Sequence, residues 1–253
     1  MRNSIIEARG LTKRFGDTLA VDDIAFDVAD GSVTGLLGGN GAGKTTTMAM
    51  LLGLLVPSAG QITILGVDMV RSRYRALPFM NFASPYVDLP HRLTVRENLS
   101  VYAGLYAVPK AGRRIRELAA ELDFETLLDR PFGNLSSGQK TRVTLAKALV
   151  NTPKVLLLDE PTASLDPDSA DRIRSYLEQY AARTRATLFL ASHNMAEVER
   201  LCGEVLIMRR GRIVDSGAPQ ALIDRYRRET LEEVFLDIAR AEPIAAAEAG
   251  RAA

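Results

Sequence analysis

The segment at residues 38–45 limits what this chain can fold into more than any other part of the sequence. It reads Gly38-Gly39-Asn40-Gly41-Ala42-Gly43-Lys44-Thr45, follows the apolar run Val33 to Leu37, and opens a stretch with a helical pattern. The pattern G-x-x-x-x-G-K-[ST] between a strand and a helix is typical of a phosphate-binding loop, because its glycines let backbone N–H groups turn inward at the positive end of the helix. Lys44 would add a charge near the β- and γ-phosphates, and the Thr45 hydroxyl would bind Mg²⁺. The alternative is a glycine-rich turn before a helix.

Short apolar runs alternate with longer helical patterns along the chain, which predicts an α/β fold. The run Val155 to Leu158 is apolar without alternation, as expected of a strand that is covered on both faces in a parallel sheet. The predicted strands are Val33 to Leu37, Gln61 to Leu65, Phe79 to Phe82, Val155 to Leu158, Thr187 to Ala191 and Val205 to Met208.

Helical patterns follow Lys44 and Gly138, and another spans about 169–183. Residues 92–130 are mostly helical as well, which predicts a helical subdomain at about 86–150. A further helix past Pro219 predicts an amphipathic extension over 219–240. Its apolar face is expected to hold Leu231, Val234, Phe235 and Ile238. Residues 241–253 carry no apolar stripe and are predicted to be a disordered tail.

Composition excludes several classes of protein. The chain has 253 residues with 32 Lys and Arg against 31 Asp and Glu, so its net charge of +1 excludes a strongly basic nucleic-acid binder. Cys202 is the single cysteine, so no internal disulfide can form and a reducing cytoplasm is favoured. The longest near-continuous apolar run, Met48 to Val56, is far shorter than the roughly 20 residues of a membrane span.

Two acidic residues, Asp159 and Glu160, follow the buried run Val155 to Leu158. The carboxyl ends of parallel strands form the edge at which such sheets bind ligands. Asp159 is suited to the Mg²⁺ shell, and Glu160 to orienting or deprotonating an attacking water. Without the phosphate loop, the pair could equally be a helix cap or a solvated turn.

Residues 135–139 read Leu-Ser-Ser-Gly-Gln and precede a helical stretch. A serine cap on that helix is the simpler interpretation. The other is a second anion-binding helix end, because Ser136 and Gly138 present a hydroxyl and backbone N–H groups. The segment from Leu135 to Gln139 closely resembles the L-S-G-G-Q signature of ATP-binding cassette (ABC) ATPases.

The order of the motifs also resembles that family, with the phosphate loop first, then the signature, the Asp159–Glu160 pair and His193. The resemblance covers about residues 5–218. It implies a P-loop NTPase cassette over residues 1–218, with a RecA-like parallel-sheet core, an N-terminal antiparallel β subdomain and a helical signature subdomain.

The resemblance implies roles for individual residues. Phe15 matches the aromatic residue that stacks on adenine, although it could also be a core side chain. Asp166, in Ala163-Ser164-Leu165-Asp166, matches the D-loop that contacts the opposing cassette; without the family it reads as the start of a helix. His193 matches the switch histidine that contacts the γ-phosphate, whereas His91 is expected on the surface. The implied ATP-binding residues are Phe15, Gly38, Gly39, Asn40, Gly41, Ala42, Gly43, Lys44, Thr45 and Thr46.

In this family, two cassettes enclose two ATP molecules head to tail, and the signature of one closes over the phosphate loop of the other. The resemblance therefore implies ATP and Mg²⁺, a second cassette, and an integral membrane permease on a separate chain. A homodimer is expected, and pairing with a paralogue is the alternative. The expected location is cytoplasmic, peripheral on the cytoplasmic face of the plasma (inner) membrane. Residues 231–236 resemble the C-terminal helix of ABC-2 exporter-type cassettes, which favours export; an ordinary amphipathic helix packing on its own domain is the alternative.

Three residues depart from the family pattern. Gly39 replaces the usual proline of the phosphate loop, and Ser137 stands where glycine is usual in the signature. Ser84 aligns with the Q-loop glutamine, which in the family touches Mg²⁺ or the attacking water and senses the membrane partner. No glutamine occurs between residues 62 and 138. The Ser84 side chain is shorter than that of glutamine, so it could reach a metal only through a water.

Two other functions stay open. A nucleotide-binding regulator with weak hydrolysis is suggested by the missing glutamine and opposed by Glu160 and His193. A soluble ABC ATPase acting on ribosomes or DNA would usually have two cassettes or a long insertion, and a broad basic surface that the net charge does not suggest. No nucleic-acid partner is expected.

Overall fold

Six strands form a mostly parallel sheet at the centre of the fold. In the computed structural model, which describes residues 4–85, 87–163 and 165–240, their order is β10-β9-β3-β8-β7-β6. All neighbours are parallel except β9 and β10. The strands are β3 (Val33–Leu37), β6 (Met80–Ala83), β7 (Val155–Asp159), β8 (Thr187–Ser192), β9 (Glu204–Arg209) and β10 (Arg212–Gly217). The carboxyl ends of β3, β6, β7 and β8 therefore meet at one edge of the sheet.

A second sheet is antiparallel, with the order β2-β1-β4-β5. Its strands are β1 (Ser4–Phe15), β2 (Thr18–Ala29), β4 (Ala59–Ile64) and β5 (Val67–Asp68). The family resemblance predicted this N-terminal antiparallel part, whereas the apolar runs alone missed β1 and β2. These strands carry charged residues on an exposed face, where Nη2 of Arg9 lies 2.7 Å from Oδ1 of Asp27, so neither strand forms a continuous apolar run.

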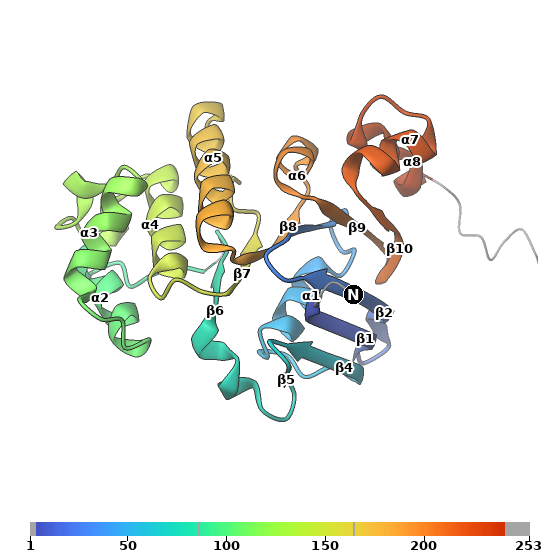
Figure 1. Ribbon diagram of the computed structural model, residues 1–253, viewed down its shortest axis with the longest axis horizontal. Helices are drawn as coiled ribbons and strands as arrows, with labels where there is room; N and C mark the ends of the chain where they lie inside the picture. Colours follow the sequence, from blue (N-terminus) through green and yellow to red (C-terminus); the bar gives the residue numbers. More distant parts are fainter. Residues whose placement is uncertain (1–3, 86, 164, 241–253) are drawn as a thin grey trace, which may run out of the picture.

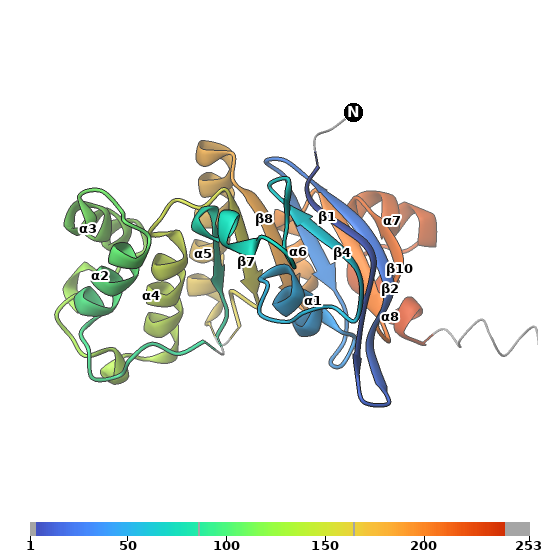
Figure 2. The same ribbon diagram turned by 90° about the horizontal axis from the view of Figure 1, so that it is seen from below.

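The helices divide into groups by position (Figure 1). α1 (Lys44–Leu51) packs between the two sheets, whereas α5 (Pro167–Thr184) and α6 (Met195–Leu201) cover the other face of the central sheet. In both views, α2, α3 and α4 gather at one end of the molecule and α7 and α8 at the other (Figures 1 and 2). The remaining α-helices are α2 (Val95–Leu105), α3 (Ala111–Glu121), α4 (Ser137–Leu149), α7 (Pro219–Tyr226) and α8 (Leu231–Arg240). Short 3₁₀ turns lie at Arg73–Arg75, Leu77–Phe79, Glu125–Leu127 and Phe132–Asn134.

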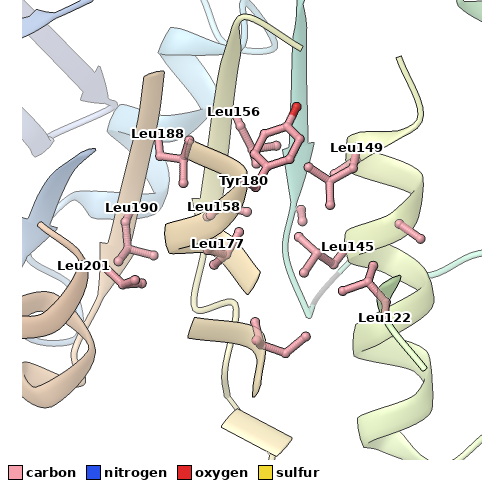
Figure 3. Packing of buried hydrophobic residues seen from close by; sticks show 14 of the residues in the cluster. Leu122, Leu145, Leu149, Leu156, Leu158, Leu177, Tyr180, Leu188, Leu190 and Leu201 are labelled. Carbon is pink, nitrogen blue, oxygen red and sulfur yellow. The ribbon is translucent and has the colours of Figure 1, made fainter. Parts of the chain in front are cut away.

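Alternate side chains of β7 enter different cores. Val155 and Leu157 pack with α1 and the antiparallel sheet, whereas Leu156 and Leu158 pack with the helices of the opposite face. All four are at most 1% exposed, which explains why this strand is apolar without alternation. On the helical side, residues of α5 lie beside β7, with α4 next to them (Figure 3); those labelled are Leu156, Leu158, Leu177, Tyr180, Leu145 and Leu149.

The C-terminal extension contains two helices rather than the single helix expected over 219–240. α7 ends at its cap residue Arg227, which has φ +55, and α8 begins four residues later at Leu231. A left-handed residue is a common helix end. The expected apolar face is the one that packs: Leu231, Val234 and Ile238 are buried, and Phe235 is partly buried. The expected tail at 241–253 lies outside the described residues.

Within residues 4–85, 87–163 and 165–240, no helix combines the length and the apolar character needed to cross a membrane.

Candidate nucleotide site

The predicted phosphate loop joins the end of β3 to the first turn of α1. Gly43 caps α1 with φ +108 and Gly41 has φ +75, a backbone region that glycine enters at little cost. A Cβ on Gly43 would lie 2.6 Å from the carbonyl oxygen of Ala20, whereas one on Gly39 or Gly41 would meet nothing within 4 Å. The loop is thus packed closely beneath and open above, as an anion-binding loop requires.

The ammonium of Lys44 is held by the phosphate loop, and the charges of two acids act on it. Its Nζ donates to the carbonyl oxygens of Gly38, at 2.5 Å, and Gly39, at 3.3 Å. Burial lowers the pKa of Lys44, and the charges of Glu160 and Asp159 oppose that shift. Among the described residues no acid pairs with Lys44 within 4.0 Å, so its charge is directed to the loop itself, where a phosphate would lie.

Asp159 ends β7 and is 4% exposed. Burial and the Glu160 charge raise the pKa of Asp159, whereas Lys44 and the Ser84 hydroxyl lower it. Ser84 lies at the end of β6, is itself buried, and donates from Oγ to Oδ2 of Asp159 at 3.4 Å. The residue at the Q-loop position therefore contacts the acid expected to bind metal.

Asp159 and Thr45, which is exposed on the first turn of α1, fit the way in which proteins hold Mg²⁺. That ion is usually bound through one or two carboxylates together with substrate phosphates and waters. In the described part of the chain, no three His, Cys, Asp or Glu side chains gather as a metal-binding cluster. A magnesium site here would thus need phosphate oxygens as well as the protein ligands.

Glu160 contacts His193 across the ends of β7 and β8. Nδ1 of His193 lies 2.6 Å from Oε1 of Glu160, and the histidine side chain is 67% exposed while that of the glutamate is 11% exposed. Glu160 has φ +50, a left-handed conformation that is strained for a residue with a side chain, and its N–H donates to the carbonyl of Ala191 at 2.8 Å. This backbone turns the carboxylate toward the histidine at the ligand-binding edge of the sheet.

The signature begins α4. Ser136 caps the helix: its Oγ accepts from the N–H of Gln139 at 3.3 Å, while Oε1 of Gln139 accepts from the N–H of Ser136 at 3.0 Å. Leu135 is buried, and Ser136 and Ser137 are exposed. The serine-cap interpretation therefore describes the local structure, and it leaves the helix end with Ser137 and Gly138 open to an anion.

Asp166 caps α5 through its side chain, which accepts from the N–H of Ser169 at 3.0 Å. Hydrogen bonds from the Ser169 hydroxyl and from the Ser169 N–H lower the pKa of Asp166. The preceding Leu165 approaches the signature, because a Cβ on Gly138 would lie 3.3 Å from its Cδ2. Ser164, also part of the predicted D-loop, lies outside the described residues.

Comparison with known proteins identifies the family of this chain. Residues 21–163 match the family described as ABC transporter. The chain belongs to the ABC transporter family. It is 39% identical, over 93% of its length and 78% of the other protein, to the Nod factor export ATP-binding protein I of Rhizobium sp. (strain N33).

Solved structures of ABC cassettes share the whole fold. The structure of an ATP binding subunit of an ABC transporter superposes with a TM-score of 0.85 at 26% identity, covering 92% of this chain and 99% of that one. Another is cbiO1 from Clostridium perfringens, part of the ABC transporter complex cbiONQ, with a TM-score of 0.77, 31% identity, and coverage of 88% and 92%. The predicted family, the cassette fold and an ATP-binding ATPase subunit of a transporter are confirmed.

Phe15 is placed apart from the other predicted residues of the cassette. It ends β1 with 48% of its surface exposed, and Nζ of Lys13 lies 5.1 Å from its ring centroid. It is thus not a core side chain. No described contact joins it to the phosphate loop, so stacking on adenine stays a prediction.

The sequence interpretation missed two buried ionisable residues of the cassette. Glu197 on α6 is fully buried and lies close to the Glu160–His193 contact. Lys147 on α4 is 6% exposed, and its Nζ donates to the carbonyl of Phe82 on β6 at 2.7 Å. Neither residue lies in a predicted motif, so nothing in the local pattern marks these charges as facing inward.

Proposed function

We propose that this ABC cassette hydrolyses ATP with Glu160 as the general base and His193 as its partner, and thereby powers export through a permease on a separate chain. The observation that carries the proposal is the 2.6 Å contact between Glu160 and His193, at the sheet edge that also holds Lys44 and Asp159. A base and a polar partner beside a phosphate loop are what the hydrolysis of a phosphoanhydride needs.

The phosphate loop would bind the phosphates of ATP through the backbone N–H groups of residues 38–46 and the Lys44 ammonium. Thr45 and Asp159 would hold Mg²⁺, which when bound neutralises charge on the phosphates. Phe15 would stack on the adenine.

Glu160 would orient the attacking water and accept its proton, because its carboxylate is held at the sheet edge by a strained backbone. His193 would contact the γ-phosphate from its exposed ring while Nδ1 keeps the contact with Glu160. The two side chains would thus work as one unit. Ser84, through its hydroxyl contact with Asp159, would take the Q-loop position at the metal.

Two copies of the chain would enclose ATP, with the signature of one acting on the ATP bound to the other. The exposed start of α4 at Ser136–Gly138 would supply this second anion contact, and Leu135 and Gln139 would hold it in shape. Asp166, beside the signature, would face the opposing cassette. A homodimer would supply both halves of each site, since every chain carries one of each motif.

The direction of transport and the location belong to the same proposal. The relative named as a Nod factor export protein and the packed C-terminal helix α8 favour an exporter. The cassette would then bind an integral membrane permease and lie on the cytoplasmic face of the plasma membrane. Recovery of the chain with membranes only when such a permease is co-expressed would support this part.

Hydrolysis is tested with the purified chain, Mg²⁺ and ATP, beside Glu160→Gln. We expect turnover in the parent and a loss in kcat of about 100-fold or more in the variant. Size-exclusion chromatography should show that the variant forms a dimer when ATP is added. Glu117→Gln, on the exposed side of α3, is the matched control and should keep full activity. ATP binding without turnover in either protein, even with the permease present, would contradict the proposal and favour a nucleotide-binding regulator.

A further inference from the structure

Close to the Glu160–His193 contact lies a buried carboxylate that forms no ion pair within 4.0 Å in the described part of the chain. Glu197 of α6 has no exposed surface, and among the described residues no Lys, Arg or His comes within ion-pairing distance of it. Burial of a charge that lacks an opposite charge is costly unless hydrogen bonds satisfy it. The position of this acid therefore depends on the groups that donate to it.

Two hydroxyl groups meet the Glu197 carboxylate, one on each oxygen. Thr162 donates from Oγ1 to Oε1 at 2.8 Å, and Ser192 donates from Oγ to Oε2 at 2.6 Å. Both side chains are themselves at most 7% exposed. Burial raises the pKa of Glu197, and these two hydrogen bonds oppose that shift.

The two hydroxyls belong to the two segments that carry the catalytic pair. Thr162 follows Glu160 by two residues, and Ser192 directly precedes His193. Ser192 also lies at the Glu160 carboxylate itself, with its Oγ 3.5 Å from Oε2. Glu197 thus joins the segment after β7 to the end of β8.

The start of α6 fixes Glu197 in turn. Its N–H donates to Oδ1 of Asn194 at 3.2 Å, and the N–H of Asn194 donates to Oγ of Ser192 at 3.1 Å. The helix cap and the buried acid therefore share Ser192 as a common partner. Any change in the position of α6 would be transmitted to both segments.

We propose that Glu197 is a positioning residue that holds Glu160 and His193 in contact. Its carboxylate ties the two loop segments together through Thr162 and Ser192 and so supports the strained backbone of Glu160. A displacement of about 1 Å at a reacting group can cost on the order of 100-fold in rate, which sets the scale of the expected effect. The inference rests on the proposed role of Glu160 and His193.

The variants compare loss of the carboxylate with loss of packing. Glu197→Ala removes both hydrogen bonds and should lower kcat about 10- to 100-fold while the Kd for ATP stays unchanged. Glu197→Gln keeps the shape and one acceptor oxygen, and should recover most of the rate. Val198→Ala is the control, because Val198 is equally buried on the same helix and its side chain has no atom that could accept a hydrogen bond from either hydroxyl. Equal losses in Val198→Ala and Glu197→Ala would overturn the inference.

A second readout needs no turnover. The chain has two histidines, so the imidazole resonances of His193 and His91 can be assigned by single substitution. Glu197→Ala should move the His193 resonances as Glu160→Gln does, while His91, on the loop after β6, stays as an internal reference. An unmoved His193 resonance would overturn the inference, and a moved one would support it even if the chain proved unable to hydrolyse ATP.

Thr162→Val provides the same test if Glu197→Ala does not fold. It removes one of the two hydroxyl donors and keeps the branched shape of the side chain. A shift of the His193 resonances smaller than that in Glu160→Gln would support the inference, and no shift would contradict it.

Discussion

Nδ1 of His193 lies 2.6 Å from Oε1 of Glu160, so the two side chains assigned to hydrolysis form one hydrogen-bonded unit. The histidine remains largely exposed, whereas the glutamate is almost enclosed. A short contact of this kind orients the carboxylate and leaves the other edge of the ring free for a ligand. Loss of either member should therefore affect the reaction rather than the binding of ATP.

His193→Ala should lower kcat about 100-fold and change the Kd for ATP by no more than a few-fold, because the phosphate loop and Lys44 are untouched. Steady-state hydrolysis and a binding titration measure the two quantities. His91→Asn is the control: His91 is the other histidine, half-exposed and paired with Asp88. An equal loss of activity in both variants would contradict a specific role for His193.

Ser84→Ala should raise the Mg²⁺ concentration needed for half-maximal hydrolysis about threefold. The Ser84 hydroxyl lowers the pKa of Asp159 against the effects of burial and Glu160, so its removal leaves a carboxylate that is harder to deprotonate. Since metal ligands must be deprotonated, the change should grow as the pH falls. Ser100→Ala, on α2, is the control. An unchanged Mg²⁺ requirement at low pH would show that Ser84 does not act through Asp159.

The buried strands and the phosphate loop could be predicted from the sequence because their signals are local. β3 spans the predicted residues 33–37, and the loop follows it directly. By contrast, β1 and β2 could not be read from apolar runs. Their register shifts at several points, and charged residues such as Arg9 and Asp27 pair with each other across the strands. Such pairing is invisible until the partner strand is known.

The same reasoning applies to the site. Lys44, Asp159 and Glu160 carry motifs, whereas the burial of Glu197 depends on Thr162 and Ser192, which are 35 and 5 residues away along the chain. No local sequence pattern predicts that Thr162 and Ser192 both contact Glu197. The break between α7 and α8 was missed for a similar reason, since Arg227 adopts its left-handed turn without glycine or asparagine.

Lys147 should make stability depend on pH in the alkaline range. Burial lowers the pKa of Lys147 from 10.5 to about 8, so the fold penalises its charged form. The penalty is fully present below pH 8, where both folded and unfolded chains hold the proton, and it is relieved as the pH rises toward 10.5. The free energy of unfolding of the parent should gain up to about 3 kcal/mol over that interval relative to Lys147→Met.

Urea unfolding of the parent and Lys147→Met at pH 7.5 and pH 10 measures this difference. Lys147→Met also leaves the carbonyl of Phe82 without its donor, which shifts the comparison by the same amount at both pH values. Thr144→Val, on the same helix, keeps Lys147, so the difference in stability between this variant and the parent should not change with pH. A difference between the parent and Lys147→Met that is constant with pH would contradict the buried-amine interpretation.

Val234→Ala should destabilise the whole cassette, because α8 is packed into its main core. Val234 and Leu231 have no exposed surface, and the N–H of Leu231 donates to Oε1 of Glu199 on α6 at 2.7 Å. Loss of two buried methyl groups costs about 2 kcal/mol with the cavity included. For a chain of this size, that corresponds to a fall in Tm of about 4–8 °C.

Thermal unfolding should show one transition that moves as a unit, since the extension and the cassette share one hydrophobic core. Leu236→Ala, on the exposed side of the same helix, should lower Tm by less than half as much. Two separate transitions in Val234→Ala, with only the weaker one displaced, would mean that residues 219–240 fold on their own. The hydrogen bond from the N–H of Leu231 to Glu199 would then not couple the stability of α8 to that of α6.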